Sequence, residues 1–122
     1  MDINFFLDDP EMAPKPRDEI RITSLAASPM EDGRRIRVMI EITPFTPADR
    51  PSLLIAITGS EGTVLSETSV IETDQYRVSL TMHLHQALSA EKSQLELHAA
   101  LYFEPEKPQH VMSIGFSLTE GD

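Results

Sequence analysis

The sequence predicts an all-β fold, a two-sheet antiparallel sandwich of about seven strands, and three observations carry that prediction. Seven segments alternate apolar and polar residues, a turn signal follows each of them, and together they fill about 100 residues of the chain. The clearest segment, 35–42, reads RIRVMIEI. Alternation with a period of two places its aliphatic residues on one face of a strand and its charged residues on the other.

The first three strands are expected over residues 18–26, 34–43 and 52–58. Residues 31–33 (Glu-Asp-Gly) supply the turn between the first two, because glycine tolerates the left-handed backbone that tight turns require. A loop with three prolines, residues 44–51, leads to the third strand.

The fourth segment, 63–71, breaks the alternation, so we expect a β-bulge there or a crossing between the sheets. Three further strands are expected over 75–84, 94–104 and 110–119, and one helical turn over 86–92. The residues expected to face the core are Ile20, Ile22, Ile36, Val38, Ile40, Ile42, Leu53, Ile55, Ile57, Tyr76, Val78, Leu80, Met82, Leu84, Leu95, Leu97, Ala99, Leu101, Phe103, Met112, Ile114, Phe116 and Leu118.

The order and spacing of the segments between residues 18 and 119 resemble an immunoglobulin-like sandwich of the fibronectin-type-III kind. The Cys–Trp–Cys hallmark of true immunoglobulin domains is missing, because the chain contains neither cysteine nor tryptophan. The resemblance therefore implies a fold and no activity. We divide the chain into an extended N-terminal arm, residues 1–17, and a sandwich domain, residues 18–122.

The amino-acid composition limits the classes of molecule that this chain is expected to bind. The formal net charge is −10, and so strong a negative field repels phosphate backbones, which disfavours nucleic-acid binding. No stretch approaches the roughly 18 apolar residues of a membrane-spanning helix, and the N-terminus does not read as a signal peptide. The absence of cysteine fits a reducing compartment. We expect a soluble, cytoplasmic protein.

His83 and His85 are weak candidates for metal ligands. They lie two residues apart on one expected strand, so both side chains leave the same face. His98 is a possible third ligand, but the expected topology places it on the other sheet, a sandwich thickness away from His83. A metal- or small-ligand-binding protein built on these histidines is the alternative function, while no cofactor is expected.

Catalysis has little support in the sequence. No Gly-x-Ser-x-Gly nucleophile motif and no glycine-rich phosphate loop is present. The pair Gly59 and Gly62 is more typical of a hairpin turn. We therefore do not expect an enzyme.

The faces that point away from the core differ between the two expected sheets. One sheet carries charged residues, and antiparallel pairing of the first, second and fifth strands is expected to set Glu41 beside Arg21 and Arg77. The other sheet carries small and apolar residues without charge in its middle, which suggests a contact surface.

The predicted function follows from that contrast. We expect a non-catalytic interaction or structural module that contacts a protein partner or a second copy of itself, as a homodimer. The predicted interface residues are Leu54, Ala100, Tyr102 and Val111 on the uncharged face, and Phe5 and Phe6 on the arm.

Overall fold

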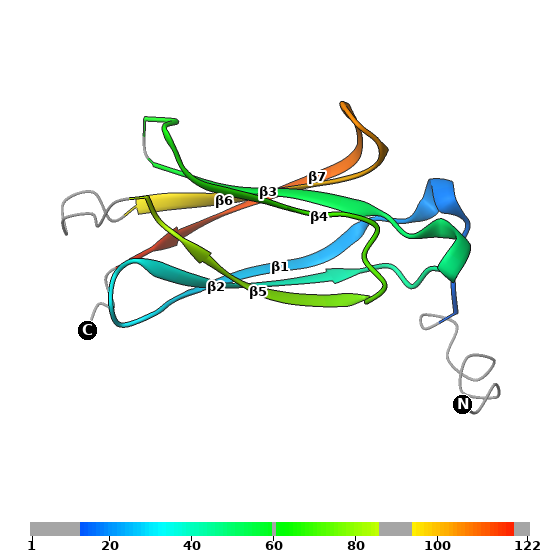
Figure 1. Cartoon of the computed structure of the whole chain (residues 1–122), viewed down its shortest axis with the longest axis horizontal. Helices are drawn as coiled ribbons and strands as arrows, with labels where there is room; N and C mark the ends of the chain where they lie inside the picture. Colours follow the sequence, from blue (N-terminus) through cyan, green and yellow to red (C-terminus); the bar gives the residue numbers. More distant parts are fainter. Residues whose placement is uncertain (1–12, 60, 86–93, 119–122) are drawn as a thin grey trace.

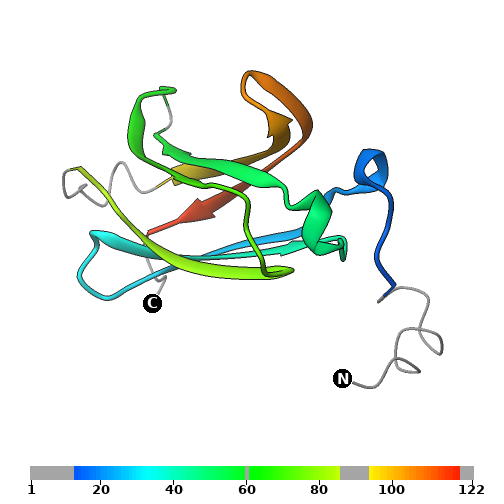
Figure 2. The same ribbon diagram turned by 45° about the vertical axis from the view of Figure 1, so that its right-hand side comes forward.

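The computed structural model describes residues 13–59, 61–85 and 94–118. Within these ranges two antiparallel sheets pack face to face, with strand orders β1-β2-β5 and β4-β3-β6-β7 (Figure 1). The strands are β1 (Ile22–Pro29), β2 (Arg35–Ile42), β3 (Ser52–Thr58), β4 (Val64–Val70), β5 (Arg77–His83), β6 (Gln94–Glu104) and β7 (Lys107–Ser117). Two short 3-10 helices, η2 (Arg17–Glu19) and η3 (Pro47–Asp49), lie at one end of the sandwich (Figure 2). The predicted fold class is confirmed.

Strand β2 shows how the sequence pattern becomes structure. Its residues alternate strictly between exposed and buried along the whole strand, with Ile36, Val38 and Ile40 almost completely buried. A helix would spread these aliphatic residues around its cylinder, whereas a strand gathers them on one face. Burying each such side chain stabilises the fold by about 1.5–3 kcal/mol.

The core lies between the two sheets and is almost entirely aliphatic. The predicted inward residues within the described ranges are all buried or packed against the core, which confirms the parity assigned to the second, third, fifth, sixth and seventh strands. The largest fully buried side chains are Ile20, Ile36, Ile40, Leu53, Ile55, Ile57, Leu97 and Leu101.

Strand β1 begins later than predicted and contains a bulge. The predicted strand started at residue 18, but residues 17–19 form η2 and β1 begins at Ile22. The register with β2 shifts between Ile22 and Ser24, so Ser24 lies opposite Glu41. The predicted pairing of Glu41 with Arg21 is therefore wrong, because Arg21 lies beside Thr43 instead.

The fourth strand belongs to the sheet of the third. β4 pairs along β3, and the register shifts between Ile57 and Thr58, which confirms the predicted irregularity as a bulge. In a constant-type immunoglobulin domain the fourth strand joins the sheet of the first two. The arrangement found here is the fibronectin-type-III-like one.

The last two strands form a tighter hairpin than predicted. β7 begins at Lys107, not at residue 110, because Glu104 and Lys107 already pair across a two-residue turn. Glu106, in that turn, has a backbone φ of 67°, a conformation that residues other than glycine adopt at a cost. The helical turn predicted over 86–92 lies outside the described residues.

The turn between β1 and β2 is organised by Asp32. Its Oδ1 accepts hydrogen bonds from the backbone N–H groups of Arg34 (3.0 Å) and Arg35 (3.1 Å), and its Oδ2 lies 2.7 Å from the Arg35 Nε. The backbone hydrogen bond from Arg34 and the side-chain hydrogen bond from Arg35 lower the pKa of Asp32 to about 2. Gly33 takes the left-handed conformation that the turn prediction required, with a φ of 68°.

No helix in the described part of the chain is long and apolar enough to cross a membrane.

Candidate interaction surface

The outer face of the four-stranded sheet carries a row of small and apolar side chains across its strands. The register places Leu54 on β3 opposite Ala100 on β6, which in turn lies opposite Val111 on β7. Leu54 is 41% exposed and Val111 is 55% exposed, so the two largest side chains of the row face outward. Ser69 of β4 continues the row on the other side of Leu54. We call Leu54, Ala100 and Val111 the apolar row, and Ser69 lies at its end.

Tyr102 lies on the same face but outside the apolar row. It is two residues beyond Ala100 on β6 and pairs with Ser52 and Pro108. Its side chain is only partly exposed. Three of the four predicted interface residues on this sheet are therefore adjacent, and Tyr102 stands at one end of them. Phe5 and Phe6, the predicted interface residues of the arm, lie outside the described residues.

A polar row follows the apolar row on the same face, with His98 at its centre. The His98 Nε2 lies 2.9 Å from the Thr58 hydroxyl, and its Nδ1 lies 2.8 Å from the Ser113 hydroxyl. Glu96 approaches the Nε2 at 3.5 Å. The imidazole thus contacts residues of β3, β6 and β7, so His98 is held in place by its neighbours.

The contact between Ser113 and His98 resembles a nucleophile beside a base, but its surroundings do not complete a catalytic site. A triad needs a carboxylate that orients the base and preorganised N–H donors that stabilise an oxyanion. Here the imidazole nitrogen that faces away from Ser113 lies 2.9 Å from the Thr58 hydroxyl and farther, at 3.5 Å, from the only carboxylate that approaches it among the described residues, that of Glu96. The arrangement is best explained as side-chain hydrogen bonds that link three neighbouring strands of the sheet.

His83 and His98 lie on different sheets, as predicted. His83 pairs with Arg35 on the outer face of the three-stranded sheet, and a cation beside it disfavours a bound metal ion. The backbone N–H of His85 donates to the carbonyl of Leu65, which joins the end of β5 to β4. Among the described residues, no three His, Asp or Glu side chains are placed to share a metal ion.

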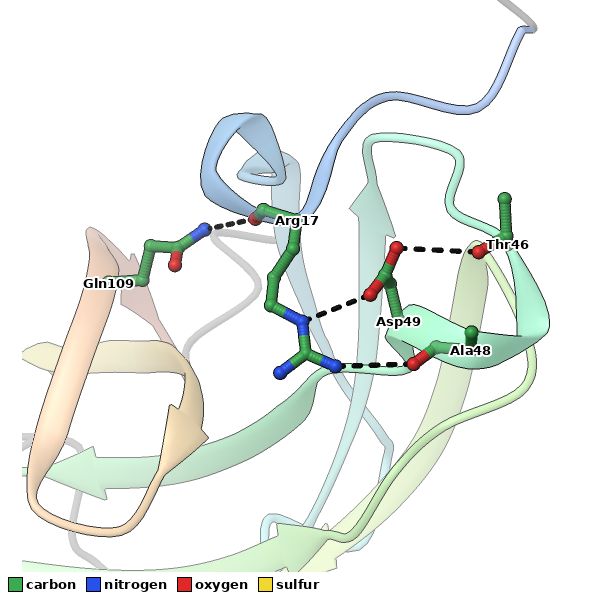
Figure 3. A network of polar contacts seen from close by, with 5 residues as sticks. All are labelled: Arg17, Thr46, Ala48, Asp49 and Gln109. Atoms are coloured by element: carbon green, nitrogen blue, oxygen red, sulfur yellow. Dashed lines mark hydrogen bonds and ion pairs between the residues drawn. The ribbon is translucent and has the colours of Figure 1, made fainter.

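A polar network that the sequence did not predict fixes the start of the sandwich domain (Figure 3). The Arg17 Nε lies 3.0 Å from the Asp49 Oδ1, its Nη2 donates to the carbonyl of Ala48 (3.2 Å), and its guanidinium lies 4.7 Å from the centre of the Phe103 ring. The Gln109 Nε2 donates to the carbonyls of Arg17 (2.8 Å) and Ile20 (2.9 Å).

This network joins three segments that are distant in the sequence: the chain before β1, the loop around η3, and the beginning of β7. The backbone N–H of Ile22 adds a bond to the same region, because it donates to the His110 Nδ1 at 3.0 Å. Contacts between residues 31 to 92 positions apart leave no periodic signal in a sequence, so only the fold reveals them.

Comparison with known proteins identifies the fold and nothing finer. No protein-family model matches the chain, and no curated protein matches it. Solved structures do match. The chain is similar to a β-glucuronidase from Bifidobacterium dentium in complex with coumarin-3-O-glucuronide, with a TM-score of 0.58, 14% identity, and coverage of 81% of this chain and 18% of that one.

Two further structures give the same picture. A glycosyl hydrolase family 2 member from Bacteroides cellulosilyticus has a TM-score of 0.55 and 10% identity, covering 81% of this chain and 15% of that one. An FMN-binding β-glucuronidase from Facaelibacterium prausnitzii has a TM-score of 0.51 and 16% identity, covering 76% of this chain and 14% of that one. This chain therefore spans less than a fifth of the length of these similar proteins, and at such identities the likeness shows the sandwich fold alone.

Proposed function

We propose that this chain is a non-catalytic interaction module that associates with a second copy of itself through the outer face of its four-stranded sheet. The observation that carries the proposal is the apolar row, in which Leu54, Ala100 and Val111 lie side by side and present two exposed aliphatic side chains. An exposed apolar patch on a sheet loses its contact with water when a matching face covers it.

A two-fold dimer suits this face because the same residues would meet across the symmetry axis. The centre of the face is uncharged, so two copies can approach there although each carries a formal net charge of −10. That net charge repels partners of the same sign at long range and makes association stronger as added salt screens it.

The size of the face limits the affinity. Four strands about 4.8 Å apart and seven residues long at about 3.3 Å per residue give a projected area of roughly 450 Å². Stable interfaces bury about 800 Å² on each partner. We therefore expect a weak, concentration-dependent dimer.

The sequence supports two further parts of the proposal. The charge of −10 argues for protein partners over nucleic acid, and the lack of cysteine suits a reducing cytoplasm. The likeness to one segment of much longer hydrolases is consistent with a module that carries no catalytic site of its own.

The test is the oligomeric state of a charge variant. Replacing Leu54 and Val111 together by glutamate should abolish the rise in weight-average mass with concentration in sedimentation experiments. Met39→Glu is the matched control, because Met39 is exposed to a similar degree (45%) but lies on the other sheet. A wild-type mass that stays monomeric at every concentration and salt, or a loss of association with Met39→Glu alone, would contradict the proposal.

A further inference from the structure

Strand β5, light green in Figure 2, is an edge of the three-stranded sheet and pairs only with β2 in the described part of the chain. At its two ends the backbone N–H of Ile42 donates to the carbonyl of Tyr76, and that of Leu84 donates to the carbonyl of Arg34. Hydrogen-bonded pairs alternate along an antiparallel ladder, so the even-numbered residues of β5 direct their backbone groups toward β2. The backbone groups that point away from the sheet are those of Arg77, Ser79, Thr81 and His83.

The next odd-numbered residue shows that this side of the chain can bond to another strand. Just beyond β5, the backbone N–H of His85 donates to the carbonyl of Leu65 on β4 at 2.9 Å. The described residues contain no such bond along the outer side of β5 itself. Leu80 of β5 and Val70 of β4 face inward but are only partly buried, so the core reaches the surface between these two edges. A strand added beside β5 would gain backbone hydrogen bonds and apolar contact together.

The edge of β5 lacks the features that protect the other edges. Native edge strands are kept from further pairing by bulges, prolines or charged side chains. β1 has a register shift and ends at Pro29, β7 contains Pro108 and two register shifts, and β4 has a register shift against β3. The pairing of β5 with β2 is regular over all seven residues, and β5 contains no proline. Among the described edge strands, β5 is therefore the one best suited to accept an extended segment.

The sheet that ends at β5 carries positive charge on an acidic protein. β1 has no charged side chain, while β2 and β5 carry Arg35, Arg37 and Arg77 against a single carboxylate, that of Glu41. Arg35 is bound to Asp32, and the Arg77 Nε lies 3.8 Å from Glu41 in an exposed pair that adds little stability. Arg37 is exposed and forms no ion pair within the described ranges. The surface beside β5 thus offers cationic partners to a carboxylate.

The spacing of the strands determines which side chains an added strand would meet. It would lie about 4.8 Å beyond β5 and about 9.6 Å beyond β2. Its outward side chains would align with Arg77, Ser79 and Thr81, and Arg37 lies opposite Thr81 on β2. An outward glutamate can meet Arg37, because the threonine between them is short. Inward side chains would meet Leu80, which favours aliphatic residues. The edge fits a segment in which acidic and aliphatic residues alternate.

We propose that the free edge of β5 binds such a segment of another protein, which adds a fourth strand to the three-stranded sheet. Main-chain hydrogen bonds supply the affinity, and the arginines select for acidic side chains. A second copy of this chain fits less well, because pairing along the whole of β5 would set Arg77 opposite His83 of that copy and bring together two formal net charges of −10. The dimer proposed above uses the opposite sheet, so either proposal can fail without the other.

A synthetic peptide, Glu-Val-Glu-Val-Glu-Val-Glu with both ends capped, tests the proposal on the whole chain. In amide spectra of the isotope-enriched protein, the peptide should shift the resonances of Ser79 and Thr81 and slow their hydrogen exchange. Those of Ala100 and Ser113, on the other sheet, should not change. The peptide with lysine in place of glutamate should bind about tenfold more weakly. The glutamate peptide methylated at every backbone nitrogen keeps its charges but has no N–H donor, so it should not bind.

Two substitutions separate the contribution of the edge from that of the charge. Ser79→Pro removes an N–H that points away from β2, which an edge strand tolerates, and it should abolish binding. Arg37→Gln should weaken binding about threefold. Lys107→Gln is the matched control, because it also removes one exposed positive charge but lies on the β6–β7 hairpin, and it should leave binding unchanged. The amide spectrum of each variant shows whether its fold is intact, and the methylated peptide tests the edge without any substitution.

Several results would overturn the proposal. They are the absence of any change at β5, equal binding of the lysine peptide, binding of the methylated peptide, and shifts centred on another strand. Amides of Ser79 and Thr81 that already resist hydrogen exchange in the free protein would overturn it as well. Resistance that grows with protein concentration would assign the edge to a second copy, and resistance independent of concentration would assign it to the chain itself.

Discussion

Removing the side chain of Arg17 tests whether the network in Figure 3 holds the start of the sandwich domain in place. Arg17→Met keeps most of the aliphatic stem and deletes the guanidinium. An exposed ion pair is worth about 0.2–1 kcal/mol, a cation over an aromatic ring about 0.5–1 kcal/mol, and a hydrogen bond to a carbonyl about 0.5–1.5 kcal/mol. The Arg17 side chain is 55% exposed, which places each contribution at the low end.

The low ends of these three ranges give an expected loss of about 1.2 kcal/mol in the free energy of unfolding. Urea denaturation followed by circular dichroism measures it, with an unchanged slope of the transition as the sign that the unfolded state is unaltered. Arg17→Lys is the matched variant: it keeps a charge near Asp49 but cannot donate to Asp49 and Ala48 in the same fixed geometry, so about half of the loss is expected.

A double-mutant cycle isolates the ion pair from the rest of the network. Asp49→Asn alone removes the charge that faces the Arg17 Nε, and the coupling energy between the two substitutions should be about 0.5 kcal/mol. A loss below about 0.3 kcal/mol for Arg17→Met, or a coupling energy of zero, would refute the reasoning.

Three further predictions concern the core and the turns. Leu97→Ala should lower the free energy of unfolding by about 2–5 kcal/mol in urea denaturation, because Leu97 is completely buried between the sheets; a loss below 1 kcal/mol would be incompatible with that packing. Glu106→Gly should raise the free energy of unfolding by about 0.5 kcal/mol, because glycine takes a φ of 67° without strain; a destabilised variant would show that the side chain matters more than the backbone. The pKa of Asp32 is lowered from 3.8 to about 2, so its stabilising contribution is complete above pH 3.8 and disappears as the pH falls through about 2. Carboxyl titration by NMR measures this pKa, and a midpoint near 4 would contradict the hydrogen bonds to Arg34 and Arg35.

The strands could be predicted because one physical rule decides them. Residues such as Ile36 and Leu97 alternate with polar neighbours, and only a strand places all of them on one face. The same rule assigned the outward positions, so Leu54, Ala100 and Val111 were expected to share a face before their pairing was known.

The incorrect predictions concern segments in which the alternation of apolar and polar residues carries no information. Thr23 and Ser24 are both polar and both exposed, so the pattern could not show that the chain gains a residue there, and it could not fix the register that sets Ser24, and not Arg21, opposite Glu41. Likewise, the strands predicted over 94–104 and 110–119 left a loop that begins at Pro105, although proline also suits the first position of a two-residue turn. The hydrogen bonds of His98 depend on its partners Thr58 on β3 and Ser113 on β7, and the sequence of β6 alone does not show which residues lie beside it.

The bonds that Gln109 and His110 make to Arg17, Ile20 and Ile22 join residues 88 to 92 positions apart. Contacts so distant along the chain form late, because a large loop must close before they contribute, and sandwiches rich in them fold in milliseconds to seconds. During synthesis, the hydrogen bonds between residues 17–22 and the start of β7 therefore cannot form until β7 has left the ribosome. Until then the first strand has one exposed flank, and this is the interval in which the nascent chain is most exposed to mispairing.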